Sequence, residues 1–171
     1  MRVRTPLGNL PWWAIVCGNA VFWPAWTAAA GYLAERVPSQ AFESDDALTR
    51  LRHFEHDGDW YRDCLLIHAW KDRIPEAGAV FGGFAKRNIQ GSDADELIEF
   101  VVECRRAEYA HWVMSSGVVL TYLWNPRWAF PVNAAVAAGS NLPCIAVQRY
   151  NRARLNRTIA RMRARSPGQS Q

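Results

Sequence analysis

A run of 24 residues without a charged side chain, from Leu10 to Leu33, limits the possible folds of this chain more than any other feature. A membrane-spanning helix needs about 20 mostly apolar residues. The run contains Asn19 and Pro24, but its tryptophans suit a membrane interface: Trp12, Trp13 and Trp26. We therefore predict an N-terminal membrane helix. The alternative is a cleaved signal peptide, because the small residues of "TAAAG" could form a cleavage site.

Two further apolar stretches follow near the C-terminus, residues 112–124 and 128–147. The tripeptide Asn-Pro-Arg at 125–127 is typical of a turn and separates them. The pair predicts a helical hairpin in the membrane. The second stretch contains Pro131 and Pro143, so we expect a kink there.

The charges are distributed unevenly along the chain. All 16 acidic residues lie between Glu35 and Glu108, with 10 of the 20 basic ones, so this middle region carries a net charge of −6 and the flanks carry +10. Such asymmetry favours contact with a membrane or a nucleic acid. A single aromatic residue, Tyr150, in the basic C-terminal segment argues against stacking on nucleic-acid bases, so we expect no nucleic-acid partner.

The arginines next to the apolar stretches predict an orientation in the membrane. Three spans would place three arginines on one side and seven on the other, and the side rich in arginine is normally cytoplasmic. The first group is Arg2, Arg4 and Arg127; the second is Arg36, Arg105, Arg106, Arg149, Arg152, Arg154 and Arg157. We therefore expect a multi-pass protein of the cell membrane whose middle region and tail face the cytoplasm.

We predict that the middle region, residues 35–106, is a soluble helical insert. Ser44 could cap a first helix, and two apolar stripes with helical spacing are interrupted at "HDGD". Residues 74–84 are loop-like. A longer helix is predicted to begin after a cap at Ser92 or Asp93 and to run unbroken into the second apolar stretch.

The tail places Leu155, Ile159 and Met162 on one helical face and several arginines on the other. This pattern is typical of a basic amphipathic helix on an anionic membrane surface. The predicted fold is thus a mainly α, small integral membrane protein. Its segments are a membrane anchor (1–34), a helical insert (35–106), a membrane hairpin (107–148) and a basic tail (149–171).

Ionisable residues gather where the second apolar stretch begins. On a helix, His111 lies about 60° from Glu108 and about 80° from Glu103, so a carboxylate could orient the imidazole as a general base. Arg106 can pair with Glu103. The alternative is that these residues form salt bridges at the end of a helix and have no catalytic function. We expect no metal site, because the spacing of Glu108 and His111 would need a second copy to bind two metal ions.

A second polar group lies at the end of the third apolar stretch. Its amides and guanidinium groups suit sugar hydroxyls or phosphates. The alternative is that the arginines only mark the cytoplasmic end of a membrane span, which would explain the arginines but not the amides. The members are Asn141, Gln148, Arg149, Asn151 and Arg152. The four cysteines are widely spaced and read as small buried thiols.

Together these stretches resemble the glycosyl-4,4'-diaponeurosporenoate acyltransferase family of staphyloxanthin-type carotenoid biosynthesis. The likeness covers about Phe42 to Arg163 and rests on two long motifs, with shorter matches at Phe54-Glu55 and Trp70-Lys71. The first motif matches Glu103, Arg106, Glu108, His111 and Trp112. The second matches Asn141, Pro143, Gln148, Arg149, Tyr150, Asn151, Arg152, Arg154 and Leu155.

The resemblance implies transfer of a fatty acyl group to the glucose C6 hydroxyl of a glycosylated carotenoid at the membrane. We predict direct transfer in which His111 is the base, Glu108 or Glu103 orients it, and Arg106 or Arg149 stabilises the oxyanion or the donor thioester. Acyl-CoA or an acyl carrier protein is the expected donor, with no separate cofactor. The predicted substrate-binding residues are Arg106, Trp112, Asn141, Gln148, Arg149, Asn151, Arg152, Trp70 and Lys71. Another glycolipid as acceptor, or a non-catalytic scaffold for pigment enzymes, stays open.

Overall fold

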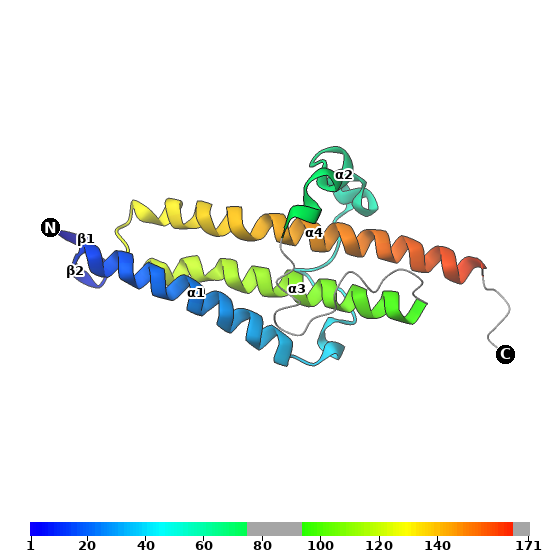
Figure 1. The fold of residues 1–171 in the computed structure, drawn as a ribbon, viewed down its shortest axis with the longest axis horizontal. Helices are drawn as coiled ribbons and strands as arrows, with labels where there is room; N and C mark the ends of the chain where they lie inside the picture. The colour runs from blue at the N-terminus through cyan, green and yellow to red at the C-terminus, as the bar shows by residue number, and fades with distance from the viewer. Residues whose placement is uncertain (75–93, 166–171) are drawn as a thin grey trace.

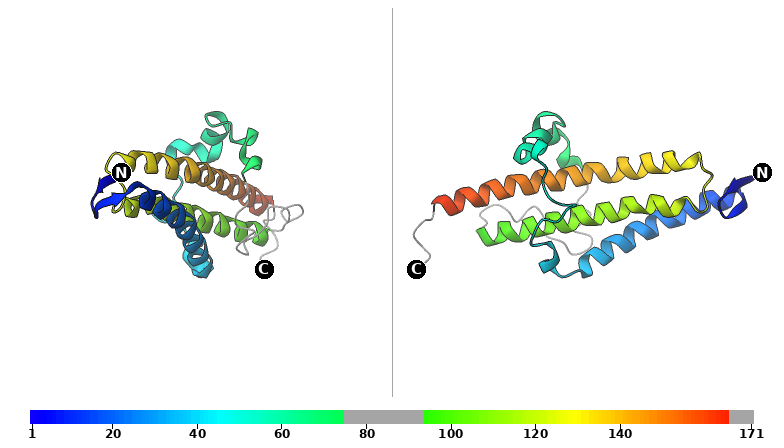
Figure 2. Two further views of the ribbon diagram at one scale, coloured as in Figure 1. Left: turned by 60° about the vertical axis from the view of Figure 1, so that its left-hand side comes forward. Right: turned by 180° about the vertical axis from the view of Figure 1, so that it is seen from behind.

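Three long helices lie side by side in the computed structural model, which describes residues 1–74 and 94–165 (Figure 1). α1 (Trp12–Arg36) and α4 (Ala129–Arg165) run in one direction, and α3 (Ala94–Thr121) runs antiparallel to both, as the views in Figure 2 also show. The other elements are short: β1 (Arg2–Thr5), β2 (Gly8–Pro11), η1 (Ser39–Phe42), η2 (His53–Gly58), α2 (Asp59–Asp63), η3 (Ile67–Ala69) and η4 (Lys71–Arg73). The mainly helical prediction is confirmed.

One half of this bundle, here called the apolar half, contains no Asp, Glu, Lys or Arg in its helices. It comprises α1 up to Ala34, α3 from Tyr109 onward and α4 up to Gln148. Many large apolar side chains of these segments are exposed, among them Trp12, Trp13, Val21, Val119, Val132 and Val136. An exposed apolar surface spread over three helices is unusual for a protein surrounded by water.

Tryptophan and asparagine side chains tie α1 to α3 and to the turn between α3 and α4 in the apolar half. The Asn19 amide nitrogen donates to Asn125 Oδ1 at 2.9 Å, and the indole of Trp124 donates to Asn19 Oδ1 at 3.0 Å. The indole of Trp26 donates to the carbonyl oxygens of Val113 and Met114. These bonds satisfy polar groups that could not reach water if lipid surrounded this half.

A short β-hairpin precedes α1, an element that the sequence did not predict. β1 and β2 pair antiparallel, and the turn between them includes Gly8, whose φ of 114° favours glycine. The backbone N–H of Leu7 donates to the carbonyl of Leu123, which anchors the hairpin to the end of α3. Arg2 and Arg4 therefore lie at the same end of the bundle as Arg127.

α4 is the one helix in the described part of the chain that is long and apolar enough to cross a membrane by length and composition. This is weak evidence for membrane association. By the same measures of length and apolar composition, neither the 25-residue α1 nor α3 qualifies. The N-terminal membrane helix and the membrane hairpin therefore remain predictions.

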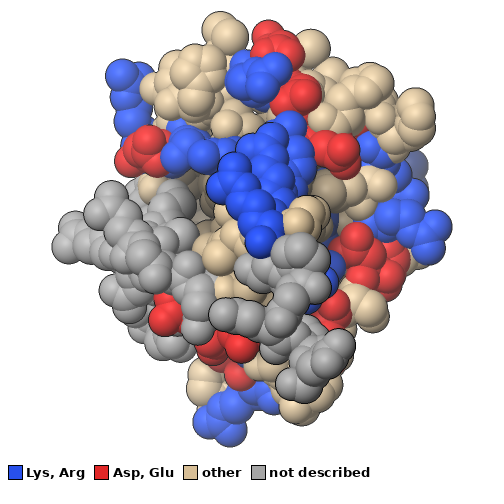
Figure 3. Space-filling view, turned by 90° about the vertical axis from the view of Figure 1, so that its right-hand side faces the viewer, with Lys and Arg blue, Asp and Glu red and all other residues tan. Residues whose placement is uncertain are grey.

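In the other half of the bundle, α3 and the C-terminal part of α4 form a contact that corrects the predicted role of the tail. Ile159 is buried against Leu97 and Val101, and Leu155 and Met162 pack on the same cluster. The apolar stripe therefore faces α3 rather than a membrane surface. The arginines lie outside, where Figure 3 shows basic side chains beside acidic ones; the exposed ones on α4 are Arg154, Arg161, Arg163 and Arg165.

The region between α1 and α3 is less regular than its apolar stripes predicted. Its described part, residues 37–74, contains four short 3₁₀ segments and one α-helix, the five-residue α2. Ser44 caps no helix; instead, the Asp46 carboxylate accepts hydrogen bonds from the backbone N–H groups of Leu48 and Thr49 and closes a turn. At "HDGD", His56 and Asp57 have positive φ values, which breaks the helical path.

α3 confirms the prediction of one helix that continues from the charged region into the apolar stretch, and the turn at 125–127 is also confirmed. α4 continues through Pro143 into the tail. The predicted segment boundaries at 106/107 and 148/149 therefore fall inside continuous helices. The predicted loop at 75–84 and the predicted cap at Ser92 or Asp93 lie outside the described residues.

Candidate active site

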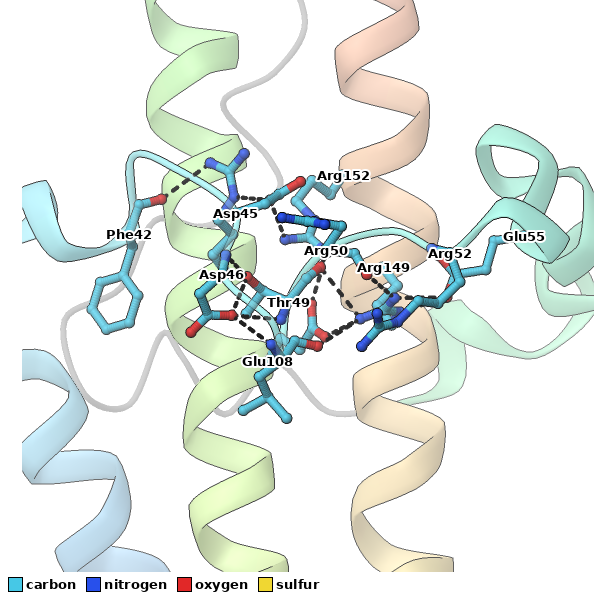
Figure 4. Close-up of polar contacts among 12 residues, drawn as sticks. Phe42, Asp45, Asp46, Thr49, Arg50, Arg52, Glu55, Glu108, Arg149 and Arg152 are labelled. Carbon is cyan, nitrogen blue, oxygen red and sulfur yellow. Dashed lines mark hydrogen bonds and ion pairs between the residues drawn. The ribbon is translucent and has the colours of Figure 1, made fainter.

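An irregular segment, residues 43–58, crosses the α3–α4 pair at the point where the apolar half ends (Figure 4). We call it the strap. Few regular hydrogen bonds hold its backbone, so its carbonyl groups need other donors. Arginine side chains from α3 and α4 supply most of them.

Arg149 of α4 is the centre of this arrangement. Its guanidinium donates to the strap carbonyls of Leu48, Thr49 and Arg50. It also forms ion pairs with Glu55 of the strap at 2.7 Å and with Glu108 of α3. All three guanidinium nitrogens are engaged within the protein, so the structure leaves Arg149 no free donor for a substrate.

Two more arginines complete a largely buried network, in which Asp45 is the exposed member. Arg152 pairs with Glu108 at 3.0 Å and with Asp45 at 3.0 Å, and it donates to the Thr49 carbonyl. Arg105 pairs with Asp45 at 2.6 Å and donates to the carbonyls of Phe42 and Glu43. Three arginines thus face three carboxylates, those of Asp45, Glu55 and Glu108, so the network is neutral overall and its charges compensate one another.

Glu55 connects the strap to the small helical cap that follows it, which is formed by α2, η3 and η4. Its carboxylate accepts a hydrogen bond from the Tyr61 hydroxyl at 2.8 Å and another from the backbone N–H of Arg52 at 2.9 Å. Burial and the neighbouring Glu55 carboxylate raise the pKa of Tyr61 above its usual value. Tyr61 therefore remains a neutral phenol that donates to Glu55.

Arg106 lies on a different face of α3 and closes the end of α1. It donates to the carbonyls of Ala34, Glu35 and Val37 and to the Ser39 hydroxyl. The predicted pairing with Glu103 is confirmed, at 3.3 Å. A guanidinium suits the last carbonyls of a helix because these carry the negative end of the helix dipole. The contacts of Arg106 are thus those of a helix cap.

His111 lies one helical turn beyond Glu108, just inside the apolar half, but no described carboxylate contacts it. Its Nδ1 lies 2.9 Å from Oδ1 of Asn141 on α4. Glu108 is held by Arg149 and Arg152 instead, and Glu103 by Arg106. The predicted carboxylate–histidine pair is therefore replaced by an amide–histidine pair, because the arginines attract both carboxylates more strongly than an imidazole would.

Other predicted binding residues lie around this α3–α4 contact. The Trp112 indole nitrogen is buried next to the Glu108 carboxylate. Asn151 is buried and Gln148 is half-buried on α4. Within residues 1–74 and 94–165, neither of these two amides has a described hydrogen bond, so both remain available to a polar ligand.

Trp70 and Lys71 lie in the cap formed by α2, η3 and η4. Trp70 packs on a core cluster that includes Tyr61 and Val147, and its indole donates to the Leu65 carbonyl at 2.8 Å. Lys71 pairs with Asp72 at 2.6 Å. The described contacts give both residues a role in the cap and bring neither to the α3–α4 contact.

The thiols differ from the buried set that the sequence predicted. Cys104 is buried, whereas Cys17 and Cys64 are exposed. Cys144 is half-buried, and its thiol lies 3.6 Å from the Ser140 carbonyl, with no base described beside it. Among the described residues, no group of three His, Cys, Asp or Glu side chains could hold a metal ion.

Sequence reasoning did not assign Asp45, Thr49, Tyr61 or Arg105 to the site. The sequence pointed to Glu55 only through the short match of Phe54-Glu55 to the family. Several of the network's acceptors are backbone carbonyls. Every residue has such a carbonyl, so the sequence does not indicate which ones accept a hydrogen bond. Arg105 had one available signal, its position next to Arg106 at the end of the acidic region.

Comparisons with known proteins agree with the motifs. A sequence model of the glycosyl-4,4'-diaponeurosporenoate acyltransferase family matches residues 42–161. A Staphylococcus aureus protein (strain bovine RF122 / ET3-1) of that name is 27% identical over 134 residues, which covers 78% of this chain and 81% of the relative. A Staphylococcus haemolyticus protein (strain JCSC1435) of the same name is 26% identical over 138 residues, covering 80% of each chain.

No solved structure matches this chain with significance. The family match, however, covers the strap, α3 and most of α4, which include every residue of the buried network and both members of the His111–Asn141 pair. The resemblance inferred from the motifs is thereby confirmed. The chain belongs to the glycosyl-4,4'-diaponeurosporenoate acyltransferase family and is, as that family indicates, an acyltransferase.

Proposed function

We propose that this enzyme transfers a fatty acyl group to the glucose C6 hydroxyl of a glycosylated carotenoid at the cell membrane. The family supports the general reaction. The observation that carries the proposal is the position of His111, inside the apolar half and one helical turn from Glu108 of the ionic network. A sugar hydroxyl and an apolar carotenoid would meet at such a boundary.

His111 is the general base in this proposal. Its Nε2 accepts the proton of the C6 hydroxyl while the oxygen attacks the carbonyl carbon of the acyl thioester. A carbon–oxygen bond forms, the carbon–sulfur bond breaks, and the departing thiolate takes the proton from His111. The acyl donor is acyl-CoA or an acyl carrier protein, and the step needs no further cofactor.

The remaining polar residues divide into two roles. Gln148 and Asn151, whose amides have no hydrogen bond within the described residues, bind the sugar hydroxyls. Arg149, Arg152 and Glu108 hold the strap in place beside His111, because their charges are already engaged with one another. This assignment revises the expectation that Arg149 or Arg106 contacts the donor directly.

The apolar half is the membrane-embedded part in this proposal. The charge-free part of α4, residues 129–148, would measure about 30 Å at 1.5 Å per residue, which matches the hydrocarbon core of a bilayer. The exposed apolar side chains of α1, α3 and α4 would contact lipid. The protein would then cross the membrane three times, with the strap and the α3–α4 ionic network on the cytoplasmic side.

Mass spectrometry of lipids and pigments tests the function. Cells that make a glycosylated carotenoid should accumulate its acyl ester when they express the wild-type chain. His111→Gln should reduce the rate about 10²–10⁴-fold. His68→Gln, a change at an exposed histidine in the cap, is the matched control and should retain full activity.

Each alternative has a distinct outcome. Acylation of another glycolipid, with the carotenoid glucoside left unchanged, would reject the carotenoid acceptor and keep the reaction type. Full activity of His111→Gln would remove His111 from the mechanism. The absence of any new acyl ester with the wild-type chain would support a scaffold function.

A further inference from the structure

The Asn141 side chain makes two hydrogen bonds that together fix how its amide is turned. Nδ2 donates to the carbonyl of Ala137, one turn earlier in α4, at 2.9 Å. Oδ1 faces Nδ1 of His111 at 2.9 Å. The side chain is buried, so water does not compete effectively for either bond.

These contacts determine which nitrogen of His111 carries the proton. An amide nitrogen only donates, so its contact with the Ala137 carbonyl leaves the Asn141 oxygen toward His111, and that oxygen only accepts. Nδ1 of His111 must therefore bear a hydrogen. In a neutral imidazole the other nitrogen, Nε2, then has a free lone pair and can accept a proton.

A neutral partner also affects the charge of the ring. A carboxylate in this position would favour the positively charged imidazolium, whereas an amide oxygen does so much less. The nearby carboxylate of Glu108 is neutralised by Arg149 and Arg152, and that of Glu103 by Arg106. The surroundings therefore favour a neutral His111.

We propose that Asn141 is a positioning residue that holds His111 in the Nδ1–H tautomer with Nε2 free to act as the base. The inference rests on the proposed catalytic role of His111. It assigns to an amide on α4 the orienting function that the sequence assigned to Glu108 or Glu103. Asn141 thereby acts through His111 rather than on the sugar.

Two substitutions separate this role from simple packing. Asn141→Leu removes the acceptor at similar volume and should lower kcat about 10–100-fold with little change in KM. Asn141→Asp keeps an acceptor but adds a charge, which raises the pKa of His111. Because the base must be unprotonated, the rising limb of the pH–rate profile should move about one unit or more to higher pH.

The chain contains a matched control in Asn133, eight residues earlier in α4. Its Nδ2 donates to the Ala129 carbonyl at 3.0 Å, as that of Asn141 does to Ala137, but its Oδ1 faces the Trp23 indole. Asn133→Leu should leave the pH–rate profile unchanged. Other charged or titratable groups could also alter the profile, but they are the same in all these proteins. They are Glu108 on α3, and Cys144 and Arg149 on α4.

A nuclear magnetic resonance experiment reads the tautomer without any activity assay. In detergent micelles, ¹⁵N-labelled histidine should show His111 as the neutral Nδ1–H form, assigned by its loss in His111→Gln. Asn141→Leu should convert the signal to the Nε2–H form or a mixture, and Asn133→Leu should not. An unchanged tautomer in Asn141→Leu, or an unshifted pH profile in Asn141→Asp, would overturn the inference.

The outcomes distinguish this inference from the proposed function. If His111→Gln is inactive but Asn141→Leu retains kcat within about twofold, only the role of Asn141 is wrong. If His111→Gln is fully active, the proposed function fails, whatever the tautomer. The ¹⁵N spectrum tests the tautomer assignment directly, independently of both activity measurements.

Discussion

At the scale of single residues, the structure separates side chains that hold the protein together from those free to bind a ligand. Arg149 looks like a substrate ligand in the sequence, yet its three nitrogens all donate within the protein. Gln148, its neighbour in the chain, has no described hydrogen bond in residues 1–74 and 94–165. Adjacent residues of one motif thus have different roles, because they point to different sides of α4.

Arg149→Met should destabilise the protein by about 3–5 kcal/mol, because Glu55 and Glu108 would each lose a buried counter-charge. Chemical unfolding in detergent micelles measures the loss. Arg161→Met, at an exposed position on the same helix, is the control and should change stability by less than about 0.5 kcal/mol. A similar small change for Arg149→Met would show that the network contributes little to stability.

Cys144→Ser should be close to neutral for acyl transfer. The half-buried thiol has no described base or cation beside it to generate a thiolate, so it is a poor nucleophile. Comparison of kcat/KM with the wild-type enzyme tests this. Isolation of an acyl thioester on Cys144 would instead establish a two-step mechanism through an acyl-enzyme.

At the scale of elements, close packing between α1 and α3 depends on a glycine. A Cβ at Gly117 would lie 2.6 Å from Cδ1 and Nε1 of Trp26. The same indole donates to the Val113 and Met114 carbonyls, so it cannot move away without losing these bonds. The α1–α3 contact is therefore sensitive to the addition of one methyl group.

Gly117→Ala should lower stability by about 1–3 kcal/mol, the usual cost of overpacking. Gly139→Ala in α4 is the matched control, because nothing lies within 4 Å of the added Cβ. That change should be neutral or stabilising by up to about 1 kcal/mol, since alanine favours helix more than glycine. Equal effects of the two changes in thermal unfolding would contradict the predicted contact.

At the scale of the whole molecule, the N-terminal hairpin and the α3–α4 turn lie at one end of the apolar half, and the strap and the ionic network lie at the other. Four of the seven arginines counted for orientation are buried in this network or at the end of α1: Arg105, Arg106, Arg149 and Arg152. Their influence on orientation would act during insertion, before the chain folds.

Cysteine labelling tests the orientation on a background in which the four native cysteines are replaced. A cysteine introduced at Ser44, which is exposed on the strap, should react with an impermeant reagent only after the cells are permeabilised. One introduced at Arg4, exposed in the hairpin, should react in intact cells. Reaction at position 44 in intact cells would reject both the orientation and a cytoplasmic acyl donor.

The sequence alone determined the properties that depend on local pattern. Apolar length and helical spacing predicted the helical stretches, the turn at 125–127 and the continuous α3, because each follows from contacts between residues close in the chain. The motifs around His111 and Asn141 were enough to identify the family, since they record residue identity directly.

Only the tertiary structure decided the partners of the charged and polar side chains. Glu108 is three residues from His111 in sequence, but two arginines more than 40 residues away bind it more strongly. The tail's apolar stripe could have faced lipid, yet α3 covers it. A side chain selects among all partners that folding brings within reach, and helical periodicity describes only those on its own helix.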